Sequence, residues 1–313
     1  MTSACSMYSG FKPFIRIILI SVILFAFSSF LFFAKADDGY LSAGLFVLDT
    51  WDASCGQIAH DTDNWEAGKH WSDAMAAHCQ TYTNLNGLIA SWATDNYRYT
   101  WGDADNHLEA FDISMIITHG GVYTANGTHR WAMLMQRETH DDSCLLCPGM
   151  SFPGHDLHDQ MFLGETASDI EILHVFSCHS MEYYMNMIPN TWQYKAAENN
   201  YRSAFAGIHQ INGMHGVSHT ENGVNTPMRD LGSNGWSNSV AHQWVFQLSR
   251  NRGDHPDDCA ISLACSDTST HAWNVINYEQ YDNRSNYPDI ADPDFCVIIW
   301  QSGCDPDSAP ALP

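Results

Sequence analysis

Residues 111–123 read FDISMIITHGGVY, and the rest of the chain is organised around this stretch. The apolar and β-branched run at 113–118 predicts a buried strand. It leads directly into His119-Gly120-Gly121, which places an imidazole at the carboxyl edge of a sheet. In open α/β sheets that edge is where ligands bind. Glycines there favour a sharp turn and a close approach of the backbone to a ligand.

A second stretch, DIEILHVFS at residues 169–177, has the same design. It is another apolar run, and it ends in Cys178-His179-Ser180. Two buried strands therefore each deliver one reactive side chain, His119 first and Cys178 second. We expect the two strands to be adjacent and parallel, with both side chains facing one crevice, because ligands of such sheets bind outside the strands' carboxyl ends.

The remaining pattern alternates between strands and helices. Strands are predicted at 41–49, 129–136, 206–217, 260–264 and 296–300, and helical spacing occurs at 64–91, 192–205 and 236–248. This alternation predicts an α/β fold with a mostly parallel sheet covered on both faces, which is a three-layer α/β/α sandwich. We assign residues 37–250 to this domain and residues 251–313 to a disulfide-bearing extension packed on it.

The amino-terminal segment 1–36 is typical of an export signal. Lys12 and Arg16 precede an apolar run at 17–34, and residues 34–36 fit a small-x-small cleavage site. An uncleaved signal anchor is the alternative, because the run reaches the lower length limit of a membrane span. Either way the remainder of the chain is expected outside the cytoplasm, secreted or periplasmic, and without a further membrane contact once the signal is cleaved.

The charge of the exported part narrows the range of partners. Removing residues 1–36 takes away three of the 13 basic residues and none of the 36 acidic ones, which leaves a net charge of −26. Such a surface excludes nucleic acids and anionic membranes as partners, and it favours basic or neutral substrates.

The cysteine count points to one free thiol. Cys5 leaves with the signal, and nine cysteines remain. Eight of them form couples along the chain, which we expect to be disulfides: 55 with 79, 144 with 147, 259 with 265, and 296 with 304. Other pairings stay open, because the connectivity of eight cysteines does not follow from sequence. Cys178 has no neighbour and is predicted to be a free, reactive thiol.

His119 and Cys178 are the residue types that hydrolysis of an amide requires. A thiol attacks an acyl carbon as thiolate, and a nearby imidazole removes its proton and later protonates the leaving amine. The developing oxyanion needs N–H donors. We expect the backbone amides of Gly120 and Cys178 to supply them.

At these residues the chain resembles the caspase-like cysteine peptidases, which include caspases, legumains, gingipains and clostripain. The matching stretches are IITHGG and HVFSCHS, and a segment like AFAGIHQINGMHG follows the cysteine in uncharacterised bacterial members. The resemblance covers roughly residues 41–250 and implies His119 as general acid/base, Cys178 as nucleophile and Gly120 as oxyanion donor. The caspase signature around the cysteine is not met, so a preference for aspartate does not carry over.

Two other classes of function remain open. A metal-dependent hydrolase would use His155 and His158 with Asp159, or His215 and His219, although the latter pair lacks the glutamate of a zinc helix. A catalytically inactive surface or binding protein would keep the fold alone. The preferred hypothesis is a secreted cysteine peptidase or amidase that acts on a peptide or protein through a Cys-His dyad and needs no cofactor.

Overall fold

The computed structural model describes residues 40–50, 62–88, 92, 107–125, 128–134, 145–146, 150–151, 158–159, 163–164, 168–181, 204–250, 253, 255–290, 293–307 and 309–313. The predicted signal segment, nearly all of the predicted helix 192–205, and Cys55, Cys144, Cys147 and His155 lie outside these residues. Within them, none of the helices is long and apolar enough to span a membrane.

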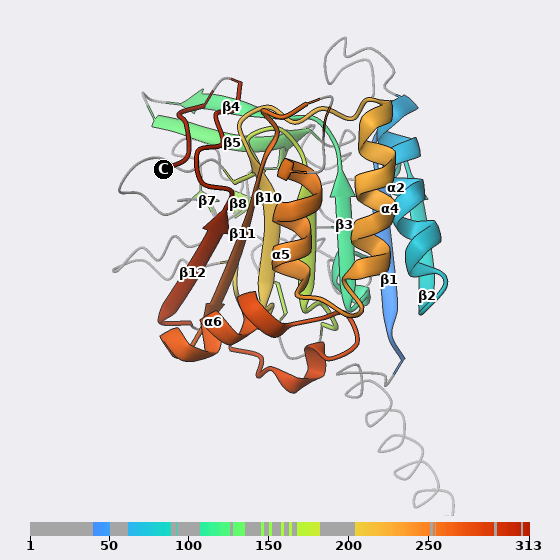
Figure 1. Cartoon of the computed structure of the whole chain (residues 1–313), viewed down its shortest axis with the longest axis vertical. Helices are drawn as coiled ribbons and strands as arrows, with labels where there is room; N and C mark the ends of the chain where they lie inside the picture. Colours follow the sequence, from blue (N-terminus) through green and yellow to red (C-terminus); the bar gives the residue numbers. More distant parts are fainter. Residues whose placement is uncertain are drawn as a thin grey trace, which may run out of the picture.

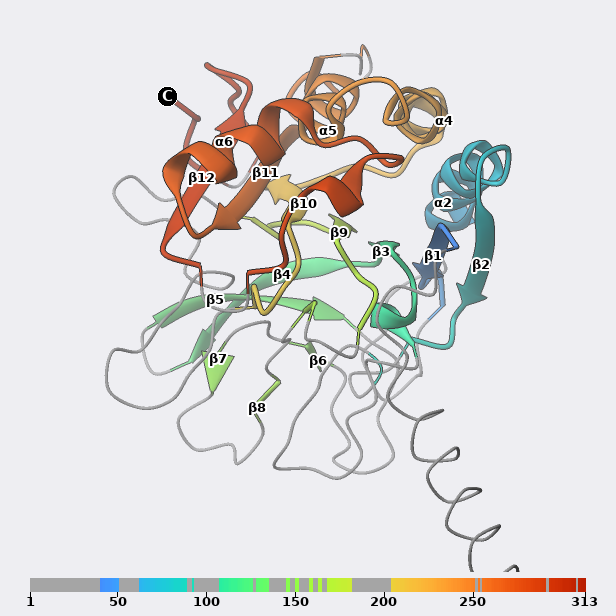
Figure 2. The same cartoon turned by 90° about the horizontal axis from the view of Figure 1, so that it is seen from below.

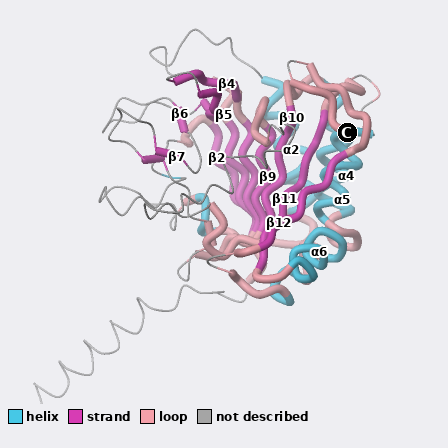
Figure 3. The backbone as a smooth tube through the Cα atoms, turned by 90° about the vertical axis from the view of Figure 1, so that its left-hand side faces the viewer, coloured by secondary structure: helices cyan, strands magenta, loops and turns pink. Residues whose placement is uncertain are grey.

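A seven-stranded sheet forms the centre of the molecule (Figures 1 and 3). Its strands are β1 (Ser42–Val47), β2 (Gln80–Leu85), β3 (Ile113–Ile117), β9 (Ile172–Phe176), β10 (Gln210–His215), β11 (Cys259–Ser266) and β12 (Phe295–Trp300). Their order is β12-β11-β10-β9-β3-β1-β2. Strands β1, β2, β3, β9 and β10 are parallel, and β11 and β12 extend the sheet in antiparallel fashion. The expected α/β fold with a mostly parallel sheet is confirmed.

Helices pack on one face of this sheet, as Figure 2 shows. They are α2 (Thr62–Met75), α4 (Asn225–Asn234), α5 (Val240–Val245), continued by the π-helical turn η6 (Phe246–Arg250), and α6 (Ser269–Tyr278). Short 3₁₀ turns are η4 (Leu108–Ala110), η5 (Asn222–Val224) and η7 (Arg284–Asn286).

The opposite side carries short strands in two small sheets: β4 (Gly120–Ala125), β5 (Thr128–Leu134) and β6 (Leu145–Leu146) in one, and β7 (Met150–Ser151) and β8 (His158–Asp159) in the other. The central sheet thus lies between two layers, consistent with a three-layer sandwich.

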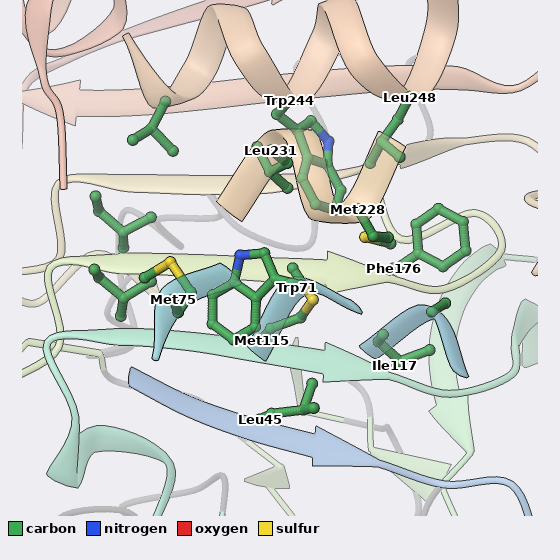
Figure 4. Packing of buried hydrophobic residues seen from close by; sticks show 14 of the residues in the cluster. Leu45, Trp71, Met75, Met115, Ile117, Phe176, Met228, Leu231, Trp244 and Leu248 are labelled. Carbon is green, nitrogen blue, oxygen red and sulfur yellow. The ribbon is translucent and has the colours of Figure 1, made fainter. Parts of the chain in front are cut away.

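Alternation along the buried strands divides the core into two parts. Met115 and Ile117 of β3 face the helices, where they join a cluster with Trp71 and Trp244 (Figure 4). Ile116 points the other way, into a separate cluster. Both faces of β3 are therefore covered, which explains why its sequence is almost entirely apolar. The exception is Ser114, which is buried and donates to the Leu108 carbonyl over 2.6 Å.

One predicted helix is only half correct. The helix expected at 64–91 ends at Met75, and residues Gln80–Leu85 form β2 instead. This segment has the composition of a strand, with Thr81, Tyr82 and Thr83 in a row, and such residues pack well on a pleated surface. It pairs in parallel with β1 and is mostly exposed.

Helices α4 and α6 were not predicted from the sequence. A capping signal was present for α6, because the Thr268 hydroxyl accepts a hydrogen bond from the His271 amide, 3.1 Å away.

The disulfides differ from the expected couples. Cys259 bonds to Cys304 and Cys265 to Cys296, while Cys79 carries a free thiol. The expected pairs 259–265, 296–304 and 55–79 are therefore wrong. Cys259 and Cys265 lie near opposite ends of β11, where six residues span about 20 Å. A disulfide tolerates at most about 7 Å between Cα atoms. Disulfides indicate an oxidising compartment.

Polar side chains gather where the parallel strands begin. Arg284 lies between two carboxyl groups, those of Asp112, just before β3, and Glu171, just before β9. Arg284 Nε is 3.0 Å from Glu171 Oε2. His209, just before β10, contacts Glu279 Oε1 through Nδ1 at 2.5 Å. These groups are mostly buried, and they join the segment after α6 to the amino-terminal edge of the sheet.

This network contains three buried or half-buried carboxyl groups and two positive partners. Burial raises the pKa of Glu171 to about 8, opposed by the nearby guanidinium of Arg284. Burial would lower the pKa of His209, but carboxylates, Glu279 first among them, outweigh it and raise this pKa to about 10. Among the buried groups, Arg284 pairs with Asp112 and a protonated His209 pairs with Glu279, which leaves Glu171 as the neutral carboxyl, while the exposed Asp289 also lies 3.2 Å from His209 Nε2.

Candidate active site

The strands that carry the two candidate catalytic residues are direct neighbours. β3 and β9 pair in parallel, with Ile117 opposite Phe176. The ladder continues one step further, because the amide of Thr118 donates to the Phe176 carbonyl over 3.3 Å. His119 and Cys178 follow immediately and therefore leave the sheet side by side at its carboxyl edge.

Ile117 and Phe176, the last residues of β3 and β9, both belong to the cluster under the helices. His119 and Cys178 follow them by two residues each. The alternation of a strand does not extend to Cys178, because the Ser180 amide donates to the Ser177 carbonyl over 3.2 Å and closes a turn that contains it.

The backbone turns sharply directly after Cys178. His179 has φ of 58°, a left-handed conformation that is uncommon outside glycine. Two hydrogen bonds hold the turn against β10 and the residue after it: the His179 amide donates to Gly216 O over 2.6 Å, and the Met214 amide donates to Ser180 Oγ over 2.7 Å. Strained backbone of this kind costs about 1–3 kcal/mol and occurs preferentially at functional sites.

Cys178 is half-buried and forms no disulfide among the described residues, as expected, but it is not alone in this, because Cys79 forms none either. The Sγ of Cys178 lies next to Ser218, on the segment that follows β10. The Ser218 amide nitrogen is 3.4 Å from Sγ, the Ser218 carbonyl oxygen 3.5 Å and the Ser218 hydroxyl 3.7 Å. Ser218 was not expected from the sequence, although it lies three residues after β10, the next parallel strand, and hence at the same edge.

His119 is half-buried and leads into β4, which begins at Gly120. Gly120 pairs with Met133 in the β4–β5 hairpin. The left-handed glycines of the described residues are Gly164, Gly207, Gly216 and Gly303. The sharp glycine turn expected after His119 is therefore not observed, because the chain passes directly into the hairpin strand instead.

Asp49 is a further residue at this edge that the sequence analysis overlooked. It follows β1, whose ladder to β3 extends to the bond from the Leu48 amide to Ile117 O at 2.9 Å. Asp49 is 6% exposed, and its Oδ1 has no hydrogen-bond partner. Its own amide donates to Asn86 Oδ1 over 2.9 Å, which fixes its backbone. A buried carboxylate oxygen without a partner is costly, and in native proteins such a group calls for an explanation.

Beyond Ser218, two imidazole rings stack next to carboxylates. The rings of His219 and His255 lie 4.0 Å apart at an angle of 9°. His219 Nδ1 is 2.8 Å from Asp258 Oδ1, and His255 Nε2 is 3.0 Å from Glu221 Oε2. Asp258 is fully buried, so it anchors His219 and the segment that carries Ser218.

Of the alternative metal ligands, His215 and His219 each contact a different partner. His215 is fully buried, and its Nε2 donates to the Pro310 carbonyl over 2.7 Å, whereas His219 is held by Asp258. For His158 and Asp159 only the backbone of β8 is described. In the part of the chain that the structure describes, no group of three His, Cys, Asp or Glu side chains is arranged to hold a metal ion.

Comparison with known proteins identifies no family. No family model matches the chain, and no curated protein matches it. Among solved structures, it is similar to protein GSU0716 from Geobacter sulfurreducens, with 12% identity and a TM-score of 0.40, over 77% of this chain and 98% of that one. A likeness at this level carries no argument about function.

Proposed function

We propose that the chain is a cysteine peptidase or amidase in which Cys178 is the nucleophile and His119 the general acid/base. The observation that carries the proposal is the parallel pairing of β3 with β9, because His119 directly follows Thr118 after β3 and Cys178, which forms no disulfide, directly follows Ser177 after β9. The strained turn at His179 supports it, since it directly follows the nucleophile. The resemblance of IITHGG and HVFSCHS to caspase-like peptidases points the same way.

The reaction would proceed in two steps. His119 takes the thiol proton, and the sulfur of Cys178 attacks the carbonyl carbon of the scissile amide. The amides of Gly120 and Cys178 donate to the oxyanion. The carbon–nitrogen bond then breaks as the imidazolium protonates the leaving amine. Water, deprotonated by His119, releases the acid from the thioester and restores the thiol.

We propose that the enzyme prefers a basic residue immediately before the cleaved bond, that is, in the residue that supplies the acyl group, for two reasons. The net charge of −26 for the exported part concentrates cationic peptides near the protein. The buried Asp49 carboxylate lies at the same edge, with one oxygen that has no partner in the structure. Gingipains and clostripain, which the core resembles, cleave after basic residues. Residues 1–36 would export the enzyme, in agreement with its disulfides.

The proposal is tested with fluorogenic peptides that end in Arg, Lys, Asn or Asp, using the mature, oxidised protein. We expect turnover of the Arg or Lys peptides that is lost in Cys178→Ala and His119→Ala. Asp49→Asn should reduce turnover of the basic peptides alone. Turnover that survives Cys178→Ala would refute the nucleophile, whereas turnover of the Asp peptide alone would refute only the preference for basic residues.

A further inference from the structure

The sulfur of Cys178 contacts three atoms of one residue, Ser218. The Ser218 amide N–H donates towards Sγ from 3.4 Å and its hydroxyl from 3.7 Å. The Ser218 carbonyl oxygen, at 3.5 Å, accepts from the protonated thiol. Ser218 therefore offers a hydrogen-bond partner to Cys178 Sγ both as the thiol and as the thiolate. The two donors match the ionised sulfur, which is the stronger acceptor and the form that attacks a substrate.

Neighbours on both sides fix the position of Ser218. Before it, the amide of Val217 donates to the Asp307 carbonyl over 3.1 Å. After it, His219 binds Asp258 twice, through its amide at 3.4 Å and its Nδ1 at 2.8 Å. Because Asp258 is fully buried, the donors of Ser218 are held in place before any substrate arrives.

We propose that Ser218 is a positioning residue that holds the Cys178 side chain and stabilises its thiolate. The inference rests on the proposed function, because it takes Cys178 as the nucleophile. It assigns to the segment after β10 a part in activation that is separate from proton removal by His119. The ionisable groups on the elements that meet here are His119 after β3, His179 on the turn, and His219 with Asp258 beyond Ser218.

The test measures the thiolate directly and needs no substrate. Iodoacetamide alkylation of Cys178 is followed by mass spectrometry of its peptide in the full mature protein, at about pH 6 and about pH 9.5, since only the thiolate reacts. For Ser218→Ala we expect the ratio of the alkylation rate at about pH 6 to the rate at about pH 9.5 to fall about fivefold. The reason is that a hydrogen-bond donor to the thiolate is lost. Ser218→Thr keeps the hydroxyl and should keep the ratio. Ser266→Ala, a buried serine at the end of β11, is the matched control.

An unchanged ratio in Ser218→Ala would overturn the proposal. Equal slowing at both pH values would also overturn it, because that result indicates altered access to the sulfur rather than loss of a donor. An equal fall of the ratio in Ser218→Thr, which keeps the hydroxyl, would indicate that Ser218 has a structural role alone. None of these outcomes depends on peptide turnover, so a failure of the peptidase proposal stays distinguishable from a failure of this one.

Discussion

Replacing Glu171 by Gln should make the protein more stable at high pH. In the folded chain the pKa of Glu171 is raised to about 8, mainly by burial, from an ordinary value of 4.5. A carboxyl group with a raised folded pKa contributes stability that is fully present below pH 4.5 and is lost as the pH rises through about 8. Gln has the shape of the neutral carboxyl and does not ionise, so Glu171→Gln removes this loss.

The size of the effect follows from the shift in pKa. Each unit corresponds to about 1.4 kcal/mol, so the shift sets an upper limit of about 5 kcal/mol. The Glu171 side chain is 16% exposed and lies beside Arg284, so we expect about 2–4 kcal/mol at pH 9 after solvent relaxation. The two proteins should be nearly equal near pH 4.5, and the difference in free energy of unfolding should open between about pH 5 and pH 8.

The assay is urea unfolding of the oxidised protein, followed by tryptophan fluorescence at about pH 5, pH 7 and pH 9. Glu279→Gln is the contrasting variant, because it removes the charged partner of His209 and should destabilise the protein at each of these pH values. A difference between Glu171→Gln and wild type that does not change with pH would refute the neutral Glu171 and the charge balance of the network.

Three further predictions concern stability. Replacing Cys259 and Cys304 by Ser should lower the free energy of unfolding by about 3 kcal/mol, because the Cys265–Cys296 bond remains and the outer bond then closes a loop of only about 15 further residues, and thermal unfolding with peptide mapping checks both loss and connectivity. Trp244→Ala should cost about 4 kcal/mol in urea unfolding, since the ring is fully buried, whereas Trp244→Phe should cost less than half of that. Asn86 has φ of 59°, so Asn86→Gly should be about 1 kcal/mol more stable than Asn86→Ala, and equal stability of the two would contradict the left-handed backbone.

Strands β3 and β9 were predictable because both are buried on both faces and each contains a single polar residue, Ser114 and His174 respectively. Residues 113–118 and 169–177 read as strands for that reason, and β3 and β9 lie within these stretches. Edge strand β2 was not predictable in the same way. Its residues are exposed and obey no burial pattern, so the helical spacing of the preceding segment was extended through it in error.

The residues of the candidate site also differ in how far the sequence predicts them. His119 and Cys178 stand directly after apolar strands, so their position followed from the strands themselves. Asp49 and Ser218 depend on which strands are neighbours, and the sequence does not contain that order. Pairing of the cysteines was missed for the same reason, because closeness along the chain favoured 259 with 265, whereas strand pairing sets Cys265 opposite Cys296.

The two disulfides are nested, since the Cys265–Cys296 bond lies inside the loop that Cys259–Cys304 closes. Closure of the inner bond aligns β11 with β12 and raises the effective concentration of the outer pair of thiols for one another. The outer bond then secures Cys259, the neighbour of Asp258, whose carboxylate holds His219 beside Ser218. We therefore expect a reducing environment to loosen the segment that contacts the Cys178 thiol as well as to weaken the fold.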